Sequence, residues 1–250
     1  MGDENGGRRH RVSLTEHPHP PCQPGYGGRH TSWRRKMSNR VLFVCAANVC
    51  RSPFMAATFV EEGSGSVDGT EWAVRSRGIS VVRQHPMCRL AASLIDPGTE
   101  GAASAASHVS TQIAHADLDE HDLIIAASRE ERARVARMQP RTRGRTFTLK
   151  EAVALGAPPL EEGERRRVLA DGRGPATLAD YAEILDRRRG RVRMPQQTGL
   201  RFPWSAHDDP RDVPDVHHDS TRRHTRVLKE SRGLVRDLHD QVSHFLSASA

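Results

Sequence analysis

The chain has 250 residues and a formal net charge of +7, with 36% hydrophobic and 4% aromatic residues. That length fits one ordinary domain with irregular ends. No apolar run of 18 residues occurs, so we expect no membrane span. The arginines near the N-terminus are not followed by the apolar core of a secretory signal. Four cysteines are too few for a disulfide scaffold, so a reducing cytoplasm is the expected location.

The positive charge does not by itself indicate nucleic-acid binding. Residues 1–36 hold seven basic and three acidic side chains, which accounts for +4 of the net charge. Lysine occurs only at positions 36, 150 and 229, so 35 of the 38 basic residues are arginine. We attribute that bias to genome composition, with a basic interaction tail as the alternative. Because no aromatic residues alternate with the arginines, nucleic acid is not an expected partner.

The composition divides the chain into a tail and a domain. Residues 1–37 lack hydrophobic periodicity and contain the run HPHPPCQPGYGG, which predicts a disordered N-terminal tail. Met37 directly precedes the first convincing strand, so an upstream start codon is a second explanation of the tail. Residues 38–250 are expected to form the domain, with an irregular and partly helical segment at 156–207.

Beyond the tail, short apolar runs alternate with helical patterns. The strands are expected at 41–44, 72–74, 122–126 and 146–149. The helices are expected at 53–60, 88–95, 103–114, 129–138, 150–155, 176–189 and 219–246. This alternation predicts an α/β fold with a four-stranded parallel sheet and helices on both faces. The loop after the first strand is predicted to be a phosphate-binding loop on the residues that it contains.

That loop, CAANVCRSP at 45–53, is the most informative segment. Backbone N–H groups of a strand–loop–helix turn can bind a tetrahedral oxyanion, aided by the partial positive charge of the helix N-terminus. Arg51 can hold two phosphate oxygens, and Ser52 can donate a hydrogen bond to the sulfur of Cys45. The positive charge of the helix N-terminus and of Arg51 favours the thiolate of Cys45, which makes this residue a nucleophile at neutral pH. The alternative is a small buried cysteine with a structural role.

A second cysteine, Cys50, lies in the same loop. Cys45 and Cys50 form a C-x4-C pair that matches no usual zinc spacing, so we expect neither a metal nor a cofactor. Cys50 could form a reversible disulfide with Cys45 and protect it from over-oxidation, or it could be a buried structural thiol. Both interpretations of Cys50 remain open.

The segment from Cys45 to Pro53 resembles the phosphate-binding loop of the low-molecular-weight protein-tyrosine-phosphatase family, bacterial type. Four further segments support the resemblance: VRSRG at 74–78, HVSTQI at 108–113, DLI at 122–124 and TFTLKE at 146–151. The resemblance implies that Cys45 attacks phosphorus to give a phosphocysteine and that Arg51 stabilises the equatorial oxygens. The phosphate would be bound by the loop residues Ala46, Ala47, Asn48, Val49, Cys50 and Ser52, with Asn48 holding the loop in shape.

The reaction also needs a general acid to protonate the leaving oxygen. The family carries this aspartate in an Asp-Pro-Tyr segment before the last helix, and DVPDVH at 212–217 occupies that position here. We select Asp215, although Val216 stands in place of proline and His217 in place of tyrosine. Asp208, Asp209 and Asp212 are its rivals.

Two departures from the family affect the expected substrate. Ala47 stands where many members have glycine, and a left-handed backbone there would be strained. The missing tyrosine removes an aromatic wall for a phosphotyrosine ring, for which His217, Trp204 or Tyr181 could substitute.

We therefore expect a phosphomonoester hydrolase that acts on phosphotyrosine proteins, in signalling for example, or on small phosphomonoesters. A binding protein that keeps the loop but lacks turnover is the first alternative. An arsenate reductase is the second, although Cys88 alone offers no complete thiol relay.

Overall fold

The computed structural model describes residues 39–63, 71–168, 174–192 and 209–247. The predicted tail at 1–37 lies outside these residues, as do Trp204, Asp208 and parts of the 156–207 segment. No described helix is long and apolar enough to cross a membrane.

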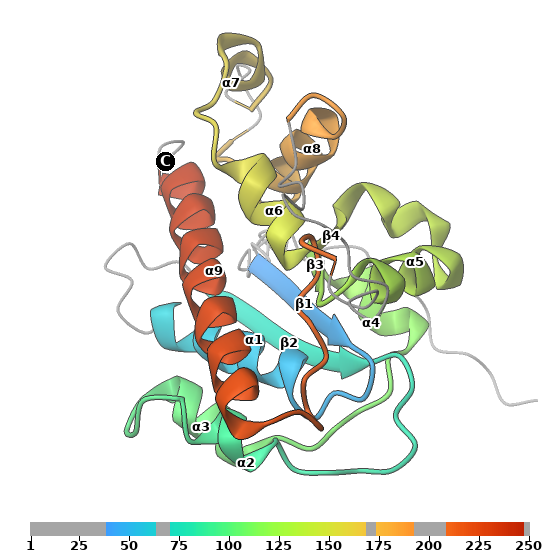
Figure 1. The fold of residues 1–250 in the computed structure, drawn as a ribbon. Coiled ribbons are helices and arrows are strands. Elements are labelled where there is room, and N and C mark those ends of the chain that lie inside the picture. The colour runs from blue at the N-terminus through green and yellow to red at the C-terminus, as the bar shows by residue number, and fades with distance from the viewer. Residues whose placement is uncertain (1–38, 64–70, 169–173, 193–208, 248–250) are drawn as a thin grey trace, which may run out of the picture. The chain divides into compact units, whose positions relative to one another are not determined.

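Four parallel strands form the sheet of the described chain (Figure 1). They are β1 (Asn39–Cys45), β2 (Trp72–Gly78), β3 (Leu123–Ala126) and β4 (Thr146–Thr148), in the spatial order β2-β1-β3-β4. The apolar run at 41–44 is fully buried in β1, as expected for a central strand of a parallel sheet. The sheet order reverses at β1, and the predicted phosphate-binding loop begins where that strand ends. Such a switch point is a favoured ligand position in open α/β sheets.

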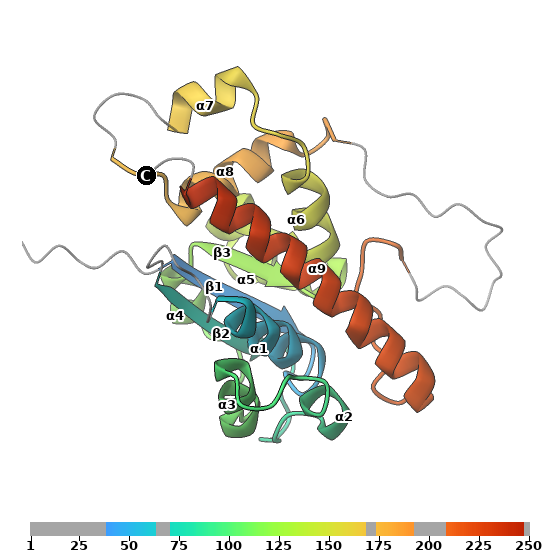
Figure 2. The same ribbon diagram turned by 90° about the vertical axis from the view of Figure 1, so that its left-hand side faces the viewer.

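Helices cover both faces of this sheet, as predicted. On one face, Phe43 of β1 belongs to the main core with residues of α1 (Arg51–Gly63), α6 (Leu149–Gly156), α8 (Leu178–Arg188) and α9 (Thr221–Ser247). Figure 2 shows α9 running across α1 and α6. On the other face, Leu42 packs with residues of α4 (His115–Glu120) and α5 (Arg129–Met138).

The sequence predictions for 88–95 and 103–114 are wrong in extent. The structure has the short helices α2 (Arg89–Ala92) and α3 (Glu100–Ser107), and 108–113 is extended. Ser110 N donates to His85 O and Gln112 forms a parallel bridge with Gly78, so these backbone groups are not available for a helix. The apolar spacing of Val109 and Ile113 looks helical but belongs to this extended strap. The following α4 was not predicted.

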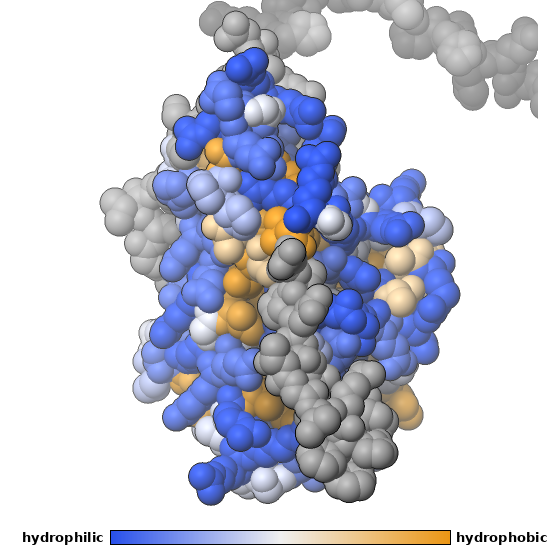
Figure 3. Space-filling model, turned by 45° about the horizontal axis from the view of Figure 1, so that its top comes forward, coloured by the Kyte–Doolittle hydropathy of each residue, from blue (hydrophilic) through white to orange (hydrophobic). Residues whose placement is uncertain are grey.

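The second half of the domain is more regular than expected. Helix α8 lies inside the predicted helix at 176–189, and the unpredicted helix α7 (Glu162–Val168) and 3-10 turn η1 (Pro140–Arg145) are added. In the view of Figure 3, hydrophilic side chains cover most of the surface, and hydrophobic ones gather in a narrow strip. Among the described large hydrophobic residues, Val82 and Val109 are the exposed ones, at 97% and 48%.

Candidate active site

The predicted nucleophile lies at the end of the central strand. Cys45 closes β1, and α1 begins at Arg51, so the loop between them surrounds the helix N-terminus. The thiol of Cys45 is buried and accepts a hydrogen bond from Ser52 Oγ at 3.0 Å and one from Asn48 N at 3.3 Å. Both donors are therefore directed at the sulfur that the sequence analysis selects as the nucleophile.

Asn48 holds the loop through its side chain. Its amide nitrogen donates to Ser52 Oγ at 3.0 Å and to Ser76 Oγ at 2.9 Å, and its oxygen accepts from Thr111 N at 2.8 Å. Asn48 has a φ of 55°, the one positive value among described non-glycine residues. The strain expected at Ala47 is therefore absent, because the left-handed conformation falls on asparagine, which tolerates it better than most residues.

The loop also packs closely on the end of β2. Ser80 N donates to Ala46 O at 2.9 Å, and Cys88 N donates to Val49 O at 2.8 Å. A β-carbon added at Gly78 would lie 2.8 Å from Ala46 O, so this position requires glycine. The resemblance at 74–78 thus corresponds to a physical contact, since Ser76 and Gly78 both support the loop.

The guanidinium of Arg51 is buried and is held by two carboxylates. Its Nη2 lies 2.6 Å from Asp215 Oδ2 and 3.2 Å from Glu131 Oε1, and its Nη1 donates to Val213 O at 3.3 Å. Burial acts to lower the pKa of Arg51, but Glu131, Cys45 and Asp215 raise it, and the net direction is upward. Arg51 therefore stays a cation. Sequence analysis missed Glu131, which is itself buried.

Asp215 reaches the site because its neighbours are anchored. Val213 and Val216 are buried in the main core, and Val213 N donates to Ala127 O at 2.8 Å. Asp215 lies between the two valines, and its side chain is 56% exposed beside Arg51. Val216, which stands where the family has proline, thus anchors the segment by packing.

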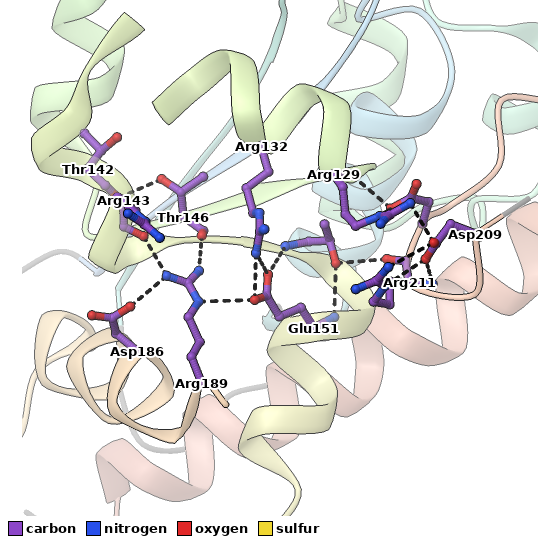
Figure 4. Close-up of polar contacts among 12 residues, drawn as sticks. Arg129, Arg132, Thr142, Arg143, Thr146, Glu151, Asp186, Arg189, Asp209 and Arg211 are labelled. Atoms are coloured by element: carbon purple, nitrogen blue, oxygen red, sulfur yellow. Dashed lines mark hydrogen bonds and ion pairs between the residues drawn. The ribbon is translucent and has the colours of Figure 1, made fainter. Parts of the chain in front are cut away.

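The rival aspartates are engaged elsewhere. Figure 4 shows Asp209 between Arg129 and Arg211, where its Oδ2 lies 2.6 Å from Arg129 Nη2. Hydrogen bonds from Arg211 lower the pKa of Asp209 to about 2, so this carboxyl remains ionised and cannot supply a proton near neutral pH. Asp212 accepts from Arg129 N at 2.9 Å at the start of α5. Asp208 lies outside the described residues.

The network in Figure 4 continues along β4 and α8. Glu151 accepts from Arg132 at 2.7 Å and from Arg189 at 3.2 Å, and Thr148 Oγ1 donates to Arg211 O at 2.9 Å. These arginines form ion pairs within the molecule, so their charge is largely offset there. The network ties the segment before Asp215 to the sheet.

Cys45, Arg51 and Asp215 line one cavity of about 750 Å³. Its other lining residues are Ala47, Val49, Cys50, Ser80, Val82, Arg83, His85, His217 and His218. Of the proposed substitutes for the missing tyrosine, His217 lies in this cavity. Tyr181 is buried against Phe245 and bonded to Gln241, and Trp204 lies outside the described residues.

Cys50 is buried on the side of the loop near α9. Its sulfur lies 2.9 Å from His224 Nε2, and burial, with Cys88 next, raises the pKa of the Cys50 thiol. Burial first, and then His217, lower the pKa of His224. All three described cysteines are free thiols, so the disulfide between Cys45 and Cys50 stays a prediction.

Comparisons with known proteins agree with this geometry. The model of the family described as low molecular weight phosphotyrosine protein phosphatase matches residues 40–156. No curated protein sequence matches the chain.

Solved structures share the fold. A low molecular weight protein tyrosine phosphatase from T. tengcongensis has a TM-score of 0.52 at 20% identity, over 81% of this chain and 99% of that one. A YwlE mutant from Bacillus subtilis has a TM-score of 0.50 at 20% identity, over 82% of this chain and 99% of that one. The YwlE arginine phosphatase from Geobacillus stearothermophilus has a TM-score of 0.50 at 19% identity, over 82% and 93% of the two chains.

Proposed function

We propose that the chain, whose residues 40–156 match the low molecular weight phosphotyrosine protein phosphatase family, hydrolyses protein phosphomonoesters through a phosphocysteine on Cys45. The family match supports a cysteine-dependent phosphatase, and the residue roles and the substrate complete the proposal. One observation carries those roles: Cys45, Arg51 and Asp215 line a single cavity at the N-terminus of α1.

The chemistry follows from those three side chains. The thiolate of Cys45 attacks phosphorus and forms an S–P bond while the bond to the leaving oxygen breaks. Arg51, the loop N–H groups and the helix N-terminus stabilise the charge on the equatorial oxygens. Asp215 in its protonated form gives its proton to the leaving oxygen, and the resulting carboxylate then takes a proton from the water that cleaves the phosphocysteine.

The ion pair between Arg51 and Asp215 has a part in this cycle. With no phosphate bound, Asp215 Oδ2 lies 2.6 Å from Arg51 Nη2. An incoming dianion would compete for the same guanidinium and release Asp215 towards the leaving group. Glu131, at 3.2 Å on the buried side, would keep Arg51 in position during that exchange.

We propose phosphotyrosine proteins as the substrate class, with small phosphomonoesters as secondary substrates. Val49 and Val82 offer apolar surface beside the cavity, and His217 offers a flat ring in place of the family's tyrosine. A role in cytoplasmic phosphoprotein signalling belongs to the same proposal, and the low number of cysteines, four in the chain, supports the cytoplasmic location.

Hydrolysis of an aryl phosphate between pH 4.5 and 8 tests the roles. Cys45→Ser should abolish turnover, and Asp215→Asn should lower kcat by about 100-fold, with a larger loss for poorer leaving groups. Asp219→Asn, a change at an aspartate four residues further on that pairs with Arg223, is the matched control and should retain the wild-type rate. Equal rates for Asp215→Asn and wild type would contradict the assigned acid.

The substrate class is tested with peptides that carry phosphotyrosine, phosphoserine or phosphoarginine. We expect the highest kcat/KM for phosphotyrosine, and a preference for phosphoarginine would overturn that choice. Phosphate binding without any turnover would identify a non-catalytic binding protein instead. Arsenate reduction by the purified chain with a thiol reductant would favour the other alternative.

A further inference from the structure

Four potential metal ligands converge beside the active-site loop. The ligand atoms of Cys50, Cys88, His217 and His224 all lie within 4.8 Å of one another. Cys50 and His224 are 174 positions apart in the sequence, yet their Sγ and Nε2 atoms are 2.9 Å apart. Because the four residues come from different segments, sequence spacing gave no sign of this cluster.

Two thiols and two imidazoles are the ligand set of a structural zinc site. Zinc bonds of about 2.3 Å to sulfur and about 2.0–2.1 Å to nitrogen would require ligand atoms roughly 3.3–3.8 Å apart. The observed limit of 4.8 Å is close enough for small side-chain rotations to reach that geometry. We propose that Cys50, Cys88, His217 and His224 bind one zinc-like divalent cation in a tetrahedral site.

The surroundings agree with a site of this kind. Cys50 and His224 are buried, and the rings of His217 and His224 meet edge to face with centroids 5.8 Å apart. Cys88 is half-buried, and its backbone N–H is already fixed on Val49 O at 2.8 Å. Binding would displace the two thiol protons to solvent, since the thiolate is the form that binds metals.

Four protein ligands would close the coordination sphere, so the cation would have a structural role. It would join the loop at Cys50, one residue before Arg51, to His217, two residues after Asp215. It would also join the loop to α9 at His224. Cys45 is not a member of the cluster, so the nucleophile would stay free. Metal binding itself does not depend on the proposed phosphatase activity. Only the suggested role of the metal in holding the catalytic pocket in shape rests on that proposed function.

Cobalt titration of the reduced, metal-free full chain tests the site. We expect one equivalent of Co²⁺ to give the intense visible bands of tetrahedral coordination together with thiolate charge transfer, and one equivalent of Zn²⁺ to remove them. Zn²⁺ should also raise the thermal midpoint by about 5–10 °C at a large excess over Kd.

Variants separate this site from other thiols and imidazoles. Cys88→Ser and His224→Asn should lose the tetrahedral spectrum and the thermal shift, with circular dichroism confirming that each still folds. Cys45→Ser, Cys22→Ser and His218→Ala are matched controls and should keep both signals. An octahedral spectrum, an unchanged signal in a folded Cys88→Ser variant, or loss of the signal in Cys45→Ser would overturn the proposal.

Discussion

At the scale of single residues, the proposed phosphate-binding loop depends on Asn48. Its side chain makes three hydrogen bonds inside the protein, and its backbone carbonyl lies 2.8 Å from His108 Nε2. The residue is fully buried and left-handed. It therefore determines both the curvature of the loop and the orientation of Ser52 towards the sulfur of Cys45.

Replacement of Asn48 by alanine should be costly for both stability and catalysis. We expect the free energy of unfolding to fall by about 3–4 kcal/mol, because buried partners lose their bonds and alanine is strained at positive φ. The value of kcat/KM should fall at least about 10-fold. Urea denaturation and aryl phosphate kinetics measure the two effects.

Two companion variants separate the causes. Asn48→Gly removes the side chain without the backbone strain, so it should be about 1 kcal/mol more stable than Asn48→Ala. Asn39→Ala removes an asparagine side chain at the other end of β1 and should leave the kinetics unchanged. A glycine variant as stable as the wild type would show that the hydrogen bonds contribute nothing.

Single residues of the candidate site also differ in whether the sequence could predict them. Cys45, Arg51 and Ser52 are close in the sequence, so their spacing next to a buried strand was enough to bring them together. Glu131 is 80 positions from Arg51, and its spacing from Ser128, which caps α5, indicates only a helix start. No local pattern predicts that this carboxylate turns inward to hold the arginine.

At the scale of elements, the second half of the domain is held together by Arg188. This buried side chain of α8 pairs with Glu164 of α7 at 2.6 Å. It also donates to the carbonyl oxygens of Leu155, Pro158 and Pro159 at 2.8–3.0 Å. One guanidinium thus connects α6, the loop after it, α7 and α8, including the one helix of this region, α7, that the sequence analysis did not predict.

Neighbouring arginines on α8 give a matched pair of variants. Arg188→Ala should lower the free energy of unfolding by about 3–5 kcal/mol, because it leaves Glu164 and three carbonyl groups without their donor. Arg187→Ala removes an exposed ion pair with Glu183 and should change it by no more than about 1 kcal/mol. Chemical denaturation of both variants measures the free energy of unfolding. Equal losses in the two variants would contradict the structural role of Arg188.

The predicted boundaries of helices and strands are wrong where long-range contacts replace local ones. The strands β1 and β3 are buried apolar runs, and α9 has a long periodic pattern, so local sequence is sufficient for them. The 108–113 strap is different, because Thr111 N bonds to the side chain of Asn48 and Ser110 N to the His85 carbonyl. Partners this distant in the sequence override a weak helical spacing.

At the scale of the whole molecule, buried histidines link folding to pH. His121 packs at the end of α4, and His108 lies in the strap. Burial lowers the pKa of each below its ordinary value of 6.5, and Arg75 for His121 and Arg77 for His108 act in the same direction. A hydrogen bond to Asp117 and the charges of Asp117 and Glu120 oppose the shift at His121.

The sign of the effect follows from proton counting. Below pH 6.5 the unfolded chain protonates both histidines while the folded chain resists protonation, so the unfolded state binds more protons. The contribution of the two histidines to the free energy of unfolding is fully present above about pH 6.5. It declines as the pH falls and levels off below the pKa values of the folded state. Each histidine can contribute a slope of up to about 1.4 kcal/mol per pH unit within that window.

Urea denaturation of the metal-free protein at pH 7.5, 6.5, 5.5 and 5.0 measures this slope. We expect His121→Gln to reduce it, because a neutral amide can keep the donor role towards the Asp117 carbonyl without titrating. His244→Gln changes an exposed histidine in the last turn of α9 and should leave the slope as in the wild type. If His121→Gln and the wild type lose stability in parallel between pH 7.5 and 5.0, His121 does not contribute to the slope.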